Sequence, residues 1–366
     1  MKKNLLFRLL PVWTLILLLG GSCSKAEKTE YTHVIPANAT EVAAIDMKAI
    51  VEKAGLNTPD SREMRQKVSG LLLNGSTPAL FKQLDNMMEH PEETGIDWDS
   101  PVYAFKAPSL HSMAATFKVS NLKKLETLLK TLAEEKFCTA PVKADGYYIS
   151  NMAEAGIQLA FNDGTLLVVY GGSATQLKKL SAAVTALIKQ PADKSIHANP
   201  FYEPIMKQKG DIRLLATPDI LPFDVRGVLN WPQGTQLYGY VLFENGRIYA
   251  CLQRADFNGE TKESNQPFHP QSTKDLQLAM AQMMHGVPFN IELTSEELLT
   301  VTNLRALMAF GADEPEVQTL YQLITRIDVL NVRGDSNRTT FTVILQDKKQ
   351  NSLKQLADFA RQFIGW

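Results

Sequence analysis

Apolar and polar residues repeat one local pattern three times along the chain. In each copy a short apolar strand is followed by a polar turn and by a helix that opens with Leu-Lys-Lys-Leu or a close variant. The leucines at positions i and i+3 share one helix face, and the lysines point away from it. The strand and helix pairs are 115–119 with 122–125, 166–170 with 177–180, and 341–345 with 353–356. The repetition indicates duplicated layers in which the leucine face lies on a sheet.

Turn residues between the repeats predict hairpins. Asn-Asp-Gly at 162–164 and Glu-Asn-Gly at 244–246 each separate two strands, and these residue types tolerate positive φ. A third hairpin is predicted across 334–337. Strands that pair with their neighbours in the chain favour an α+β fold, with mostly antiparallel sheets and helices on one face, over a doubly wound parallel sheet.

Helical periodicity and its interruption outline the domains. Further helices are predicted at 61–73, 273–284, 295–310 and 315–324. Residues suited to N-caps precede the repeated helices, namely Ser120 or Asn121, Ser173 or Thr175, and Asn351 or Ser352. The helical pattern and the alternating strand pattern both stop in the Pro-bearing stretch 217–222. We therefore predict two α+β domains, 33–216 and 217–366. Duplication of one ancestral domain is one way in which the two could be related.

The N-terminal apolar run ends in Leu19-Gly20-Gly21-Ser22-Cys23, after Lys2, Lys3 and Arg8. This order of charges, apolar run and small residues is typical of a lipoprotein signal peptide. Only about a dozen uninterrupted apolar residues follow Arg8, whereas a spanning helix needs roughly 20. The sequence thus predicts a signal peptide at 1–22, lipidation of Cys23 with palmitate among the acyl chains, and a flexible polar tether at 23–32.

Charge and location follow from that signal. The chain has 38 Lys and Arg against 39 Asp and Glu, and loss of the signal's three cations leaves a net charge of about −4. A nucleic-acid partner is therefore not expected. Ser24, rather than Asp, follows the cysteine, and by resemblance to lipoproteins of double-membrane bacteria this predicts an outer-membrane anchor. Neither the periplasmic or surface face nor the oligomeric state follows from the sequence.

The sequence contains almost no recognisable catalytic or metal-binding motif. The chain has no P-loop, no Gly-x-Gly-x-x-Gly and no His-Glu-x-x-His, and its six histidines are scattered. Asp97-Trp98-Asp99 lacks the glycine of a calcium loop, because Val102 occupies the sixth position, so a solvated acidic loop is expected. We predict no metal, no cofactor and no enzyme activity.

Three other features have alternative interpretations. Gly171–Thr175 resembles a serine-hydrolase elbow, but a helix cap explains the same residues, since Asp193 and His197 follow too closely for that fold. A methionine stripe at 280, 283 and 284 suits core filling or a partner surface. Cys138 and Cys251 form either a disulfide or two buried thiols.

Aromatic residues near the predicted domain boundary offer a candidate contact surface. Trp231 lies in Asn-Trp-Pro-Gln-Gly, a segment that cannot be helical, so its ring is expected at a surface. Tyr238 and Tyr240 share one face of the next strand. Packing under a helix is the alternative for the two tyrosines. The three rings are our candidate binding residues for a glycan or protein.

Two segments of the sequence resemble an uncharacterised lipoprotein family, domain-of-unknown-function family 4836. They are His-Val-Ile-Pro-Ala-Asn-Ala-Thr-Glu-Val-Ala-Ala-Ile-Asp at 33–46 and Gln-Asp-Lys with Asn-Ser-Leu-Lys-Gln-Leu at 346–356. The resemblance covers nearly all of the chain after Cys23. It implies a cell-envelope lipoprotein of unknown activity and assigns no catalytic residue.

The sequence therefore predicts a noncatalytic binding or assembly module, attached to a membrane by its N-terminal lipid, for a macromolecular or glycan partner. Two alternatives remain open. One is a periplasmic hydrolase whose site is assembled from remote residues, and the other is a self-assembling structural module with an exposed apolar patch or sheet edge.

Overall fold

A computed structural model shows the chain as two compact units that divide between Gln208 and Lys209. It describes residues 30–58, 89–110, 112–171, 174–221, 231–257, 264, 266–284, 287–309 and 315–364. The signal peptide, Cys23, most of the tether and the predicted helix at 61–73 lie outside these residues. No helix in the described ranges has the length and apolar content needed to span a bilayer.

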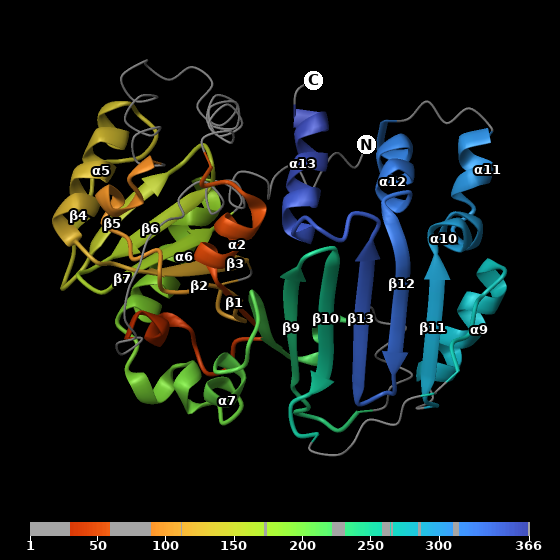
Figure 1. Cartoon of the computed structure of the whole chain (residues 1–366). Coiled ribbons are helices and arrows are strands. Elements are labelled where there is room, and N and C mark those ends of the chain that lie inside the picture. Colours follow the sequence, from red (N-terminus) through yellow and green to blue (C-terminus); the bar gives the residue numbers. More distant parts are fainter. Residues whose placement is uncertain are drawn as a thin grey trace. The chain divides into compact units, whose positions relative to one another are not determined.

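The N-terminal unit is built on an antiparallel sheet with the strand order β1-β2-β3-β7-β6-β5-β4 (Figure 1). Its strands are β1 (Glu41–Ile45), β2 (Val102–Lys106), β3 (Met113–Lys118), β4 (Val142–Lys143), β5 (Tyr148–Met152), β6 (Ile157–Phe161) and β7 (Thr165–Tyr170). Its helices are η1 (Glu30–Val34), α2 (Met47–Ala54), η3 (Pro91–Thr94), α5 (Leu122–Glu134), α6 (Ala174–Ile188), η4 (Ala192–Lys194), η5 (Ile196–Ala198) and α7 (Tyr202–Met206).

The strands of the C-terminal unit are also antiparallel and follow the order β11-β12-β13-β10-β9-β8. Its strands are β8 (Ile212–Ala216), β9 (Leu237–Glu244), β10 (Arg247–Arg254), β11 (Phe289–Thr294), β12 (Ile327–Gly334) and β13 (Arg338–Leu345). Its helices are η6 (Pro218–Ile220), α9 (Thr273–Met284), α10 (Ser295–Val301), α11 (Leu304–Ala309), α12 (Pro315–Ile324) and α13 (Ser352–Ile364). The α+β class with antiparallel sheets is confirmed.

The division between the units precedes the predicted boundary at 216/217. Strand β8 pairs along its whole length with β9, from Ile212 opposite Val241 to Ala216 opposite Leu237. Those backbone hydrogen bonds make β8 part of the C-terminal sheet. Residues 217–221, the described part of the predicted boundary stretch, include η6 and therefore belong to the C-terminal unit.

The two faces of the N-terminal sheet are both covered. Tyr103 and Phe117 point to opposite faces, because Tyr103 pairs with Thr116. Tyr31 packs on Tyr103 with ring centroids 5.7 Å apart, and Trp98 packs on Phe117 at 5.9 Å. The central strands of this unit therefore carry packed aromatic side chains on both faces.

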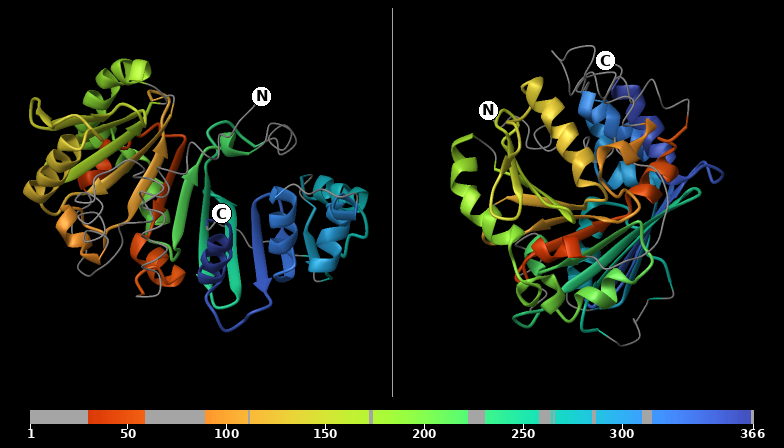
Figure 2. Two further views of the ribbon diagram at one scale, coloured as in Figure 1. Left: turned by 90° about the horizontal axis from the view of Figure 1, so that it is seen from above. Right: turned by 90° about the vertical axis from the view of Figure 1, so that its left-hand side faces the viewer.

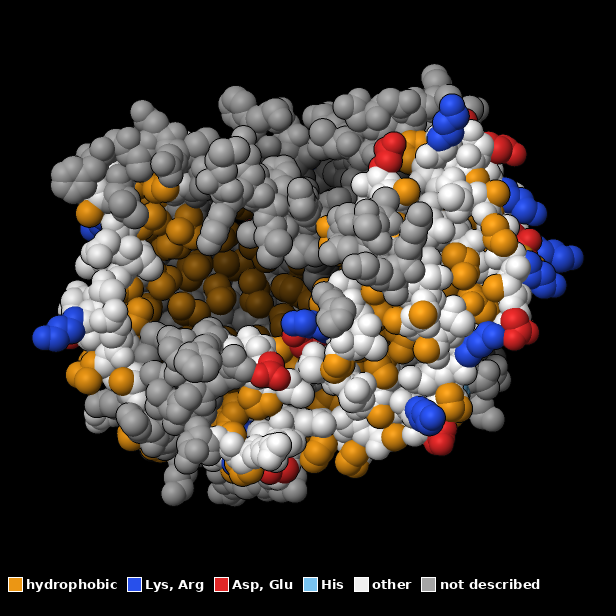
Figure 3. Space-filling view, turned by 180° about the vertical axis from the view of Figure 1, so that it is seen from behind, with side chains coloured by type: hydrophobic (Ala, Val, Ile, Leu, Met, Phe, Trp, Pro, Cys, Tyr) orange, Lys and Arg blue, Asp and Glu red, His pale blue; other side chains and the backbone are white. Residues whose placement is uncertain are grey.

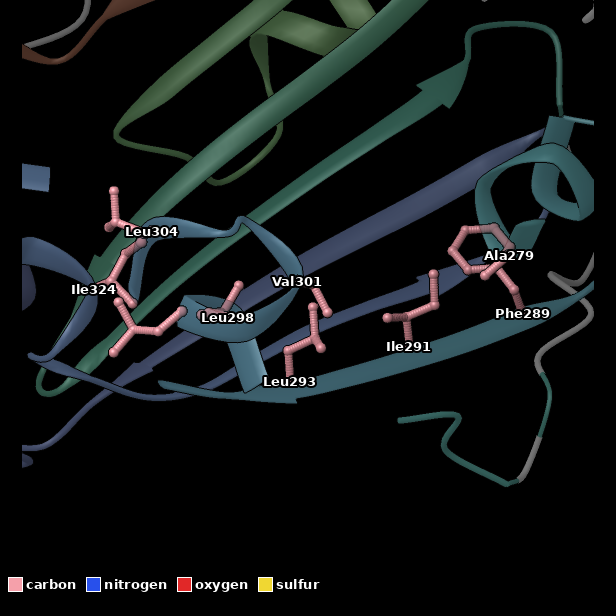
Figure 4. Packing of buried hydrophobic residues seen from close by; sticks show 9 residues of the cluster. Ala279, Phe289, Ile291, Leu293, Leu298, Val301, Leu304 and Ile324 are labelled. Atoms are coloured by element: carbon pink, nitrogen blue, oxygen red, sulfur yellow. The ribbon is translucent and has the colours of Figure 1, made fainter. Parts of the chain in front are cut away.

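Helices cover the C-terminal sheet on one face, at its β11 edge. Figures 1 and 2 show α9, α10 and α11 gathered beside β11. The core there is made of Ala279, Phe289, Ile291, Leu293, Leu298, Leu299, Val301, Leu304 and Ile324 (Figure 4). The Phe289, Ile291 and Leu293 side chains alternate with polar residues along β11, so one strand face enters the core.

Helices α5 and α13 begin with caps at positions that the sequence predicts. Asn121 Oδ1 accepts from the backbone N–H of Lys124 at the start of α5, and Asn351 Oδ1 accepts from Leu353 at the start of α13. The helix predicted over 295–310 is instead interrupted after α10. Asn303 adopts φ +54°, a left-handed conformation that ends the first helical segment.

The two units share one topology with a permuted chain order. In both, the strand after a tight hairpin turn pairs with a strand that leads to a capped helix: Val119 N–H donates to Gly164 O, and Leu345 N–H donates to Gly246 O. In sheet order, β1, β2, β3, β7, β6 and β5 take the same places as β11, β12, β13, β10, β9 and β8. The half of each unit that contains the tight hairpin is β5–β7 in the N-terminal unit and β8–β10 in the C-terminal unit. This half comes second along the N-terminal unit and first along the C-terminal unit.

Removal of a core side chain at the β11 edge tests this packing. Leu293→Ala is expected to lower the free energy of unfolding by about 2–5 kcal/mol, because it leaves a cavity under α10. Chemical denaturation followed by circular dichroism measures the change. The control Leu278→Ala, on an exposed face of α9, should stay within about 0.5 kcal/mol of wild type. Equal effects of the two variants would contradict the packing.

Candidate functional site

One face of the C-terminal sheet gathers aromatic and cationic side chains. Tyr238 and Tyr240 of β9 point to the same face, and Tyr240 pairs directly with Cys251 of β10. Gln253, which pairs with Tyr238, lies opposite Arg338 of β13. Because directly paired residues share a face, this face is opposite the one packed against α9, α10 and α12. We call Tyr238, Tyr240, Tyr249, Cys251 and Arg338 the tyrosine face.

The rings of the tyrosine face are ordered relative to one another. Tyr238 and Tyr240 are nearly parallel, with an interplanar angle of 15° and centroids 6.4 Å apart. Tyr249 tilts against Tyr240 at 5.9 Å, and the Arg247 guanidinium lies 5.2 Å from the Tyr249 centroid. The Tyr238 hydroxyl donates to Gln253 Oε1 at 3.2 Å. Half-buried rings held in this way form a preorganised surface.

The charge state of the tyrosine face is set by burial. Burial raises the pKa of Tyr238 and of Tyr240, so both phenols are neutral at physiological pH. Burial also raises the pKa of Cys251, which is 3% exposed, and the neighbouring Arg338 does not reverse this. Cys251 is therefore a neutral thiol rather than a nucleophilic thiolate. The face offers phenol rings and guanidinium donors, which suit contacts with sugar rings and polar groups.

The structure places the three predicted contact residues differently. Tyr238 and Tyr240 lie together on the tyrosine face. Trp231 is partly exposed in the loop before β9, and no ring in the described part of the chain stacks on it. Tyr249 and Arg338 were missed by the sequence analysis. Their only signal is strand register, because each lies on the same sheet face as the predicted tyrosines.

A hydroxyl, an imidazole and a carboxylate meet in the N-terminal unit. Thr32 Oγ1 lies 2.7 Å from His197 Nε2, and His197 Nδ1 lies 3.1 Å from Glu203 Oε1. Hydrolase triads use the same order of groups. Thr32 is 0% exposed, however, so no substrate reaches its hydroxyl. The arrangement instead ties η1 to η5 and α7.

The acidic loop at 97–99 is neutralised by lysines. Asp97 pairs with Lys118 at 3.1 Å, and Asp99 pairs with Lys48 at 3.5 Å. Burial works against ionisation of Asp97, but Lys118 and Ser100 hold its pKa below the usual value. Among the described residues, no group of three or more His, Cys, Asp or Glu could hold a metal ion.

The remaining candidates of the sequence analysis divide into two groups. Cys138 and Cys251 are both free and buried, which agrees with the second of their two interpretations, that of buried thiols. Residues 172 and 173 of the elbow-like segment lie outside the described residues, as do the side chains at 175, 280, 283 and 284.

One protein-family model matches the chain. A sequence model described as a domain of unknown function (DUF4836) matches residues 31–226, more than half of the chain. The match spans the described N-terminal unit and ends before β9, so the resembling phrase at 346–356 lies beyond it. No curated protein matches the chain.

Two solved structures resemble the chain at a low level. Crystal form I of TP0453 has a TM-score of 0.38 and 9% identity, and the match covers 93% of this chain and 100% of that one. Crystal form III has a TM-score of 0.36 and 10% identity, covering 92% and 99%. Likeness at these scores carries no argument about fold or function.

Protonation of His197 is expected to destabilise the N-terminal unit. Burial and nearby His33 lower the pKa of His197 although Glu203 opposes them, so the unfolded chain binds more protons below its own pKa near 6.5. Acidification from pH 7.5 to 5.5 should therefore reduce the free energy of unfolding more in wild type than in His197→Gln. Denaturation at both pH values measures this. The exposed His90→Gln should keep the wild-type pH dependence, and a His197→Gln protein that also keeps it would contradict the assignment.

Proposed function

Because the chain belongs to the DUF4836 family, whose activity is unknown, we propose its function from its own sequence and geometry: it is a lipid-anchored cell-envelope protein that binds a glycan without catalysis. The anchor is attached at Cys23, in the outer membrane, and the C-terminal unit presents the tyrosine face to the ligand. The observation that carries this proposal is the pair of parallel tyrosine rings beside Arg338 on the sheet face away from α9, α10 and α12.

The chemistry of the tyrosine face supports a sugar ligand. Aromatic ring faces pack against the apolar C–H faces of sugars, and guanidinium groups donate hydrogen bonds to hydroxyl and carboxylate oxygens. The rings of Tyr238 and Tyr240 are aligned before binding, which reduces the entropy lost on association. Burial raises the pKa values of Tyr238, Tyr240 and Cys251, whereas an activated nucleophile has a lowered pKa.

A hydrolase assembled from remote residues has weaker support. The one described hydroxyl–imidazole–carboxylate arrangement has a buried threonine in the position of the nucleophile. Both described cysteines have pKa values raised by burial, which keeps them as thiols.

The membrane anchor is tested by metabolic labelling. Cells that produce the full chain and receive labelled palmitate should show label in the wild-type protein and none in Cys23→Ser, because Cys23 is the cysteine that directly follows the predicted signal peptide. Wild type should also remain with the outer-membrane fraction. Equal labelling of the two proteins would contradict lipidation at Cys23.

Glycan binding is tested with chitotetraose, a soluble tetramer of N-acetylglucosamine, and with isolated peptidoglycan. Wild type should bind at least one of them. Tyr240→Leu should bind about tenfold more weakly, because it loses a flat ring, whereas Tyr240→Phe should stay near wild type. Trp231→Ala should also weaken binding if the ring joins the same surface. Calorimetry and pelleting measure the affinities.

The controls separate binding from folding. All variants should unfold at the wild-type temperature, since Tyr240 is only partly buried. A wild-type protein that binds neither glycan, or a Tyr240→Leu protein that binds as wild type does, would overturn the proposed surface.

A further inference from the structure

The sheet face opposite the tyrosine face is apolar and open at its middle strands. Six residues form a grid of two rows across β9, β10 and β13, which we call the apolar floor. One row is Phe243, Ile248 and Val343, and the other is Val241, Ala250 and Phe341. They share the face of Val332 and Leu330, which pack on the helix-covered core.

All six residues of the apolar floor are accessible to solvent. Phe341, in the interior strand β13, is 39% exposed, and the other five are only partly buried. Seen from behind, the C-terminal unit has a hollow lined by hydrophobic side chains (Figure 3). Soluble proteins rarely leave a contiguous apolar surface of this kind without a ligand or partner.

The N-terminal unit provides a matched comparison. The register of its hairpin places Phe161, Leu166 and Phe117 in one row and Leu159, Val168 and Ala115 in the other. All of them except Val168 are buried there, where Trp98 packs on Phe117. The same grid is therefore closed in one unit and open in the other.

The composition of the apolar floor indicates which kind of ligand would cover it. Strands β9, β10 and β13 are interior, so their backbone groups are already paired and no peptide can add to them as a strand. The six side chains present no hydrogen-bonding group, so an extended peptide laid on them would leave its backbone groups unsatisfied. A hydrocarbon chain has no such groups. The predicted lipid anchor would keep the hollow close to a bilayer, where acyl chains are abundant.

We propose that the apolar floor binds an acyl chain of a membrane lipid, with the chain lying across β9, β10 and β13 and bordered by α13, which packs on β9 and β10. The glycan surface lies on the other face of the same sheet. Each proposal can thus fail without the other.

The proposal is tested with the full chain and soluble fatty acids. Dansyl-undecanoic acid should become more fluorescent on binding, and octanoate, decanoate and laurate should displace it with affinity rising about fourfold per methylene. Phe341→Glu should bind laurate at least tenfold more weakly, since it places a charge on the floor. Ala250→Trp should do the same by filling the hollow while keeping it apolar.

Matched controls locate the bound chain. Leu278→Glu carries the same kind of change on an exposed part of α9 and should bind laurate as wild type does. Cys23→Ser should also bind, because the ligand is not the protein's own acyl group. Circular dichroism checks that each variant is folded, and Ala250→Trp decides the outcome if Phe341→Glu is not.

Three outcomes would overturn the proposal. One is a wild-type protein that does not bind the dansyl probe or laurate. Another is equal affinity in wild type, Phe341→Glu and Ala250→Trp, which would place the chain elsewhere. The third is a wild-type dimer in sedimentation that Phe341→Glu makes monomeric without a change in laurate affinity, which would identify a second copy as the occupant.

Discussion

The alternation of side chains along antiparallel strands is the constraint on which the two candidate surfaces depend. Each strand of the C-terminal sheet sends successive residues to opposite faces, so β9 contributes Tyr238 and Tyr240 to one face and Val241 and Phe243 to the other. A shift of register by one residue would exchange the two sets. The hairpin turn at 245–246 fixes this register, because Glu244 and Arg247 close the ladder beside it.

Local patterns in the sequence predict much of the fold. Asn-Gly and Asp-Gly turns located the hairpins, and the caps Asn121 and Asn351 begin helices where they were expected. The interruption at Asn303 was not predicted, because apolar periodicity continues through it and the left-handed conformation of one residue leaves no periodic signal. The boundary between the units was predicted several residues too late for a similar reason. The pairing of β8 with β9 joins segments that are separated in the sequence, and local patterns do not reveal it.

The candidate surfaces were predictable only in part. Tyr238 and Tyr240 follow from spacing within one strand, whereas Tyr249 and Arg338 join them through register with strands distant in the sequence. The openness of the apolar floor has no sequence signal at all. Val343 and Phe117 are both apolar residues in alternating strands, and what separates them is whether another segment covers them, as Trp98 covers Phe117.

The permuted correspondence of the two units bears on how such a chain arises. Tandem copying of a whole unit would preserve the order of its halves, but here the half that contains the tight hairpin comes second in one unit and first in the other. The half that begins with β1 and α2 corresponds to the second half of the C-terminal unit, which begins with β11 and α10. What the two units have in common is therefore a pair of three-stranded antiparallel segments, each followed by a helix, which follow one another in opposite order along the chain.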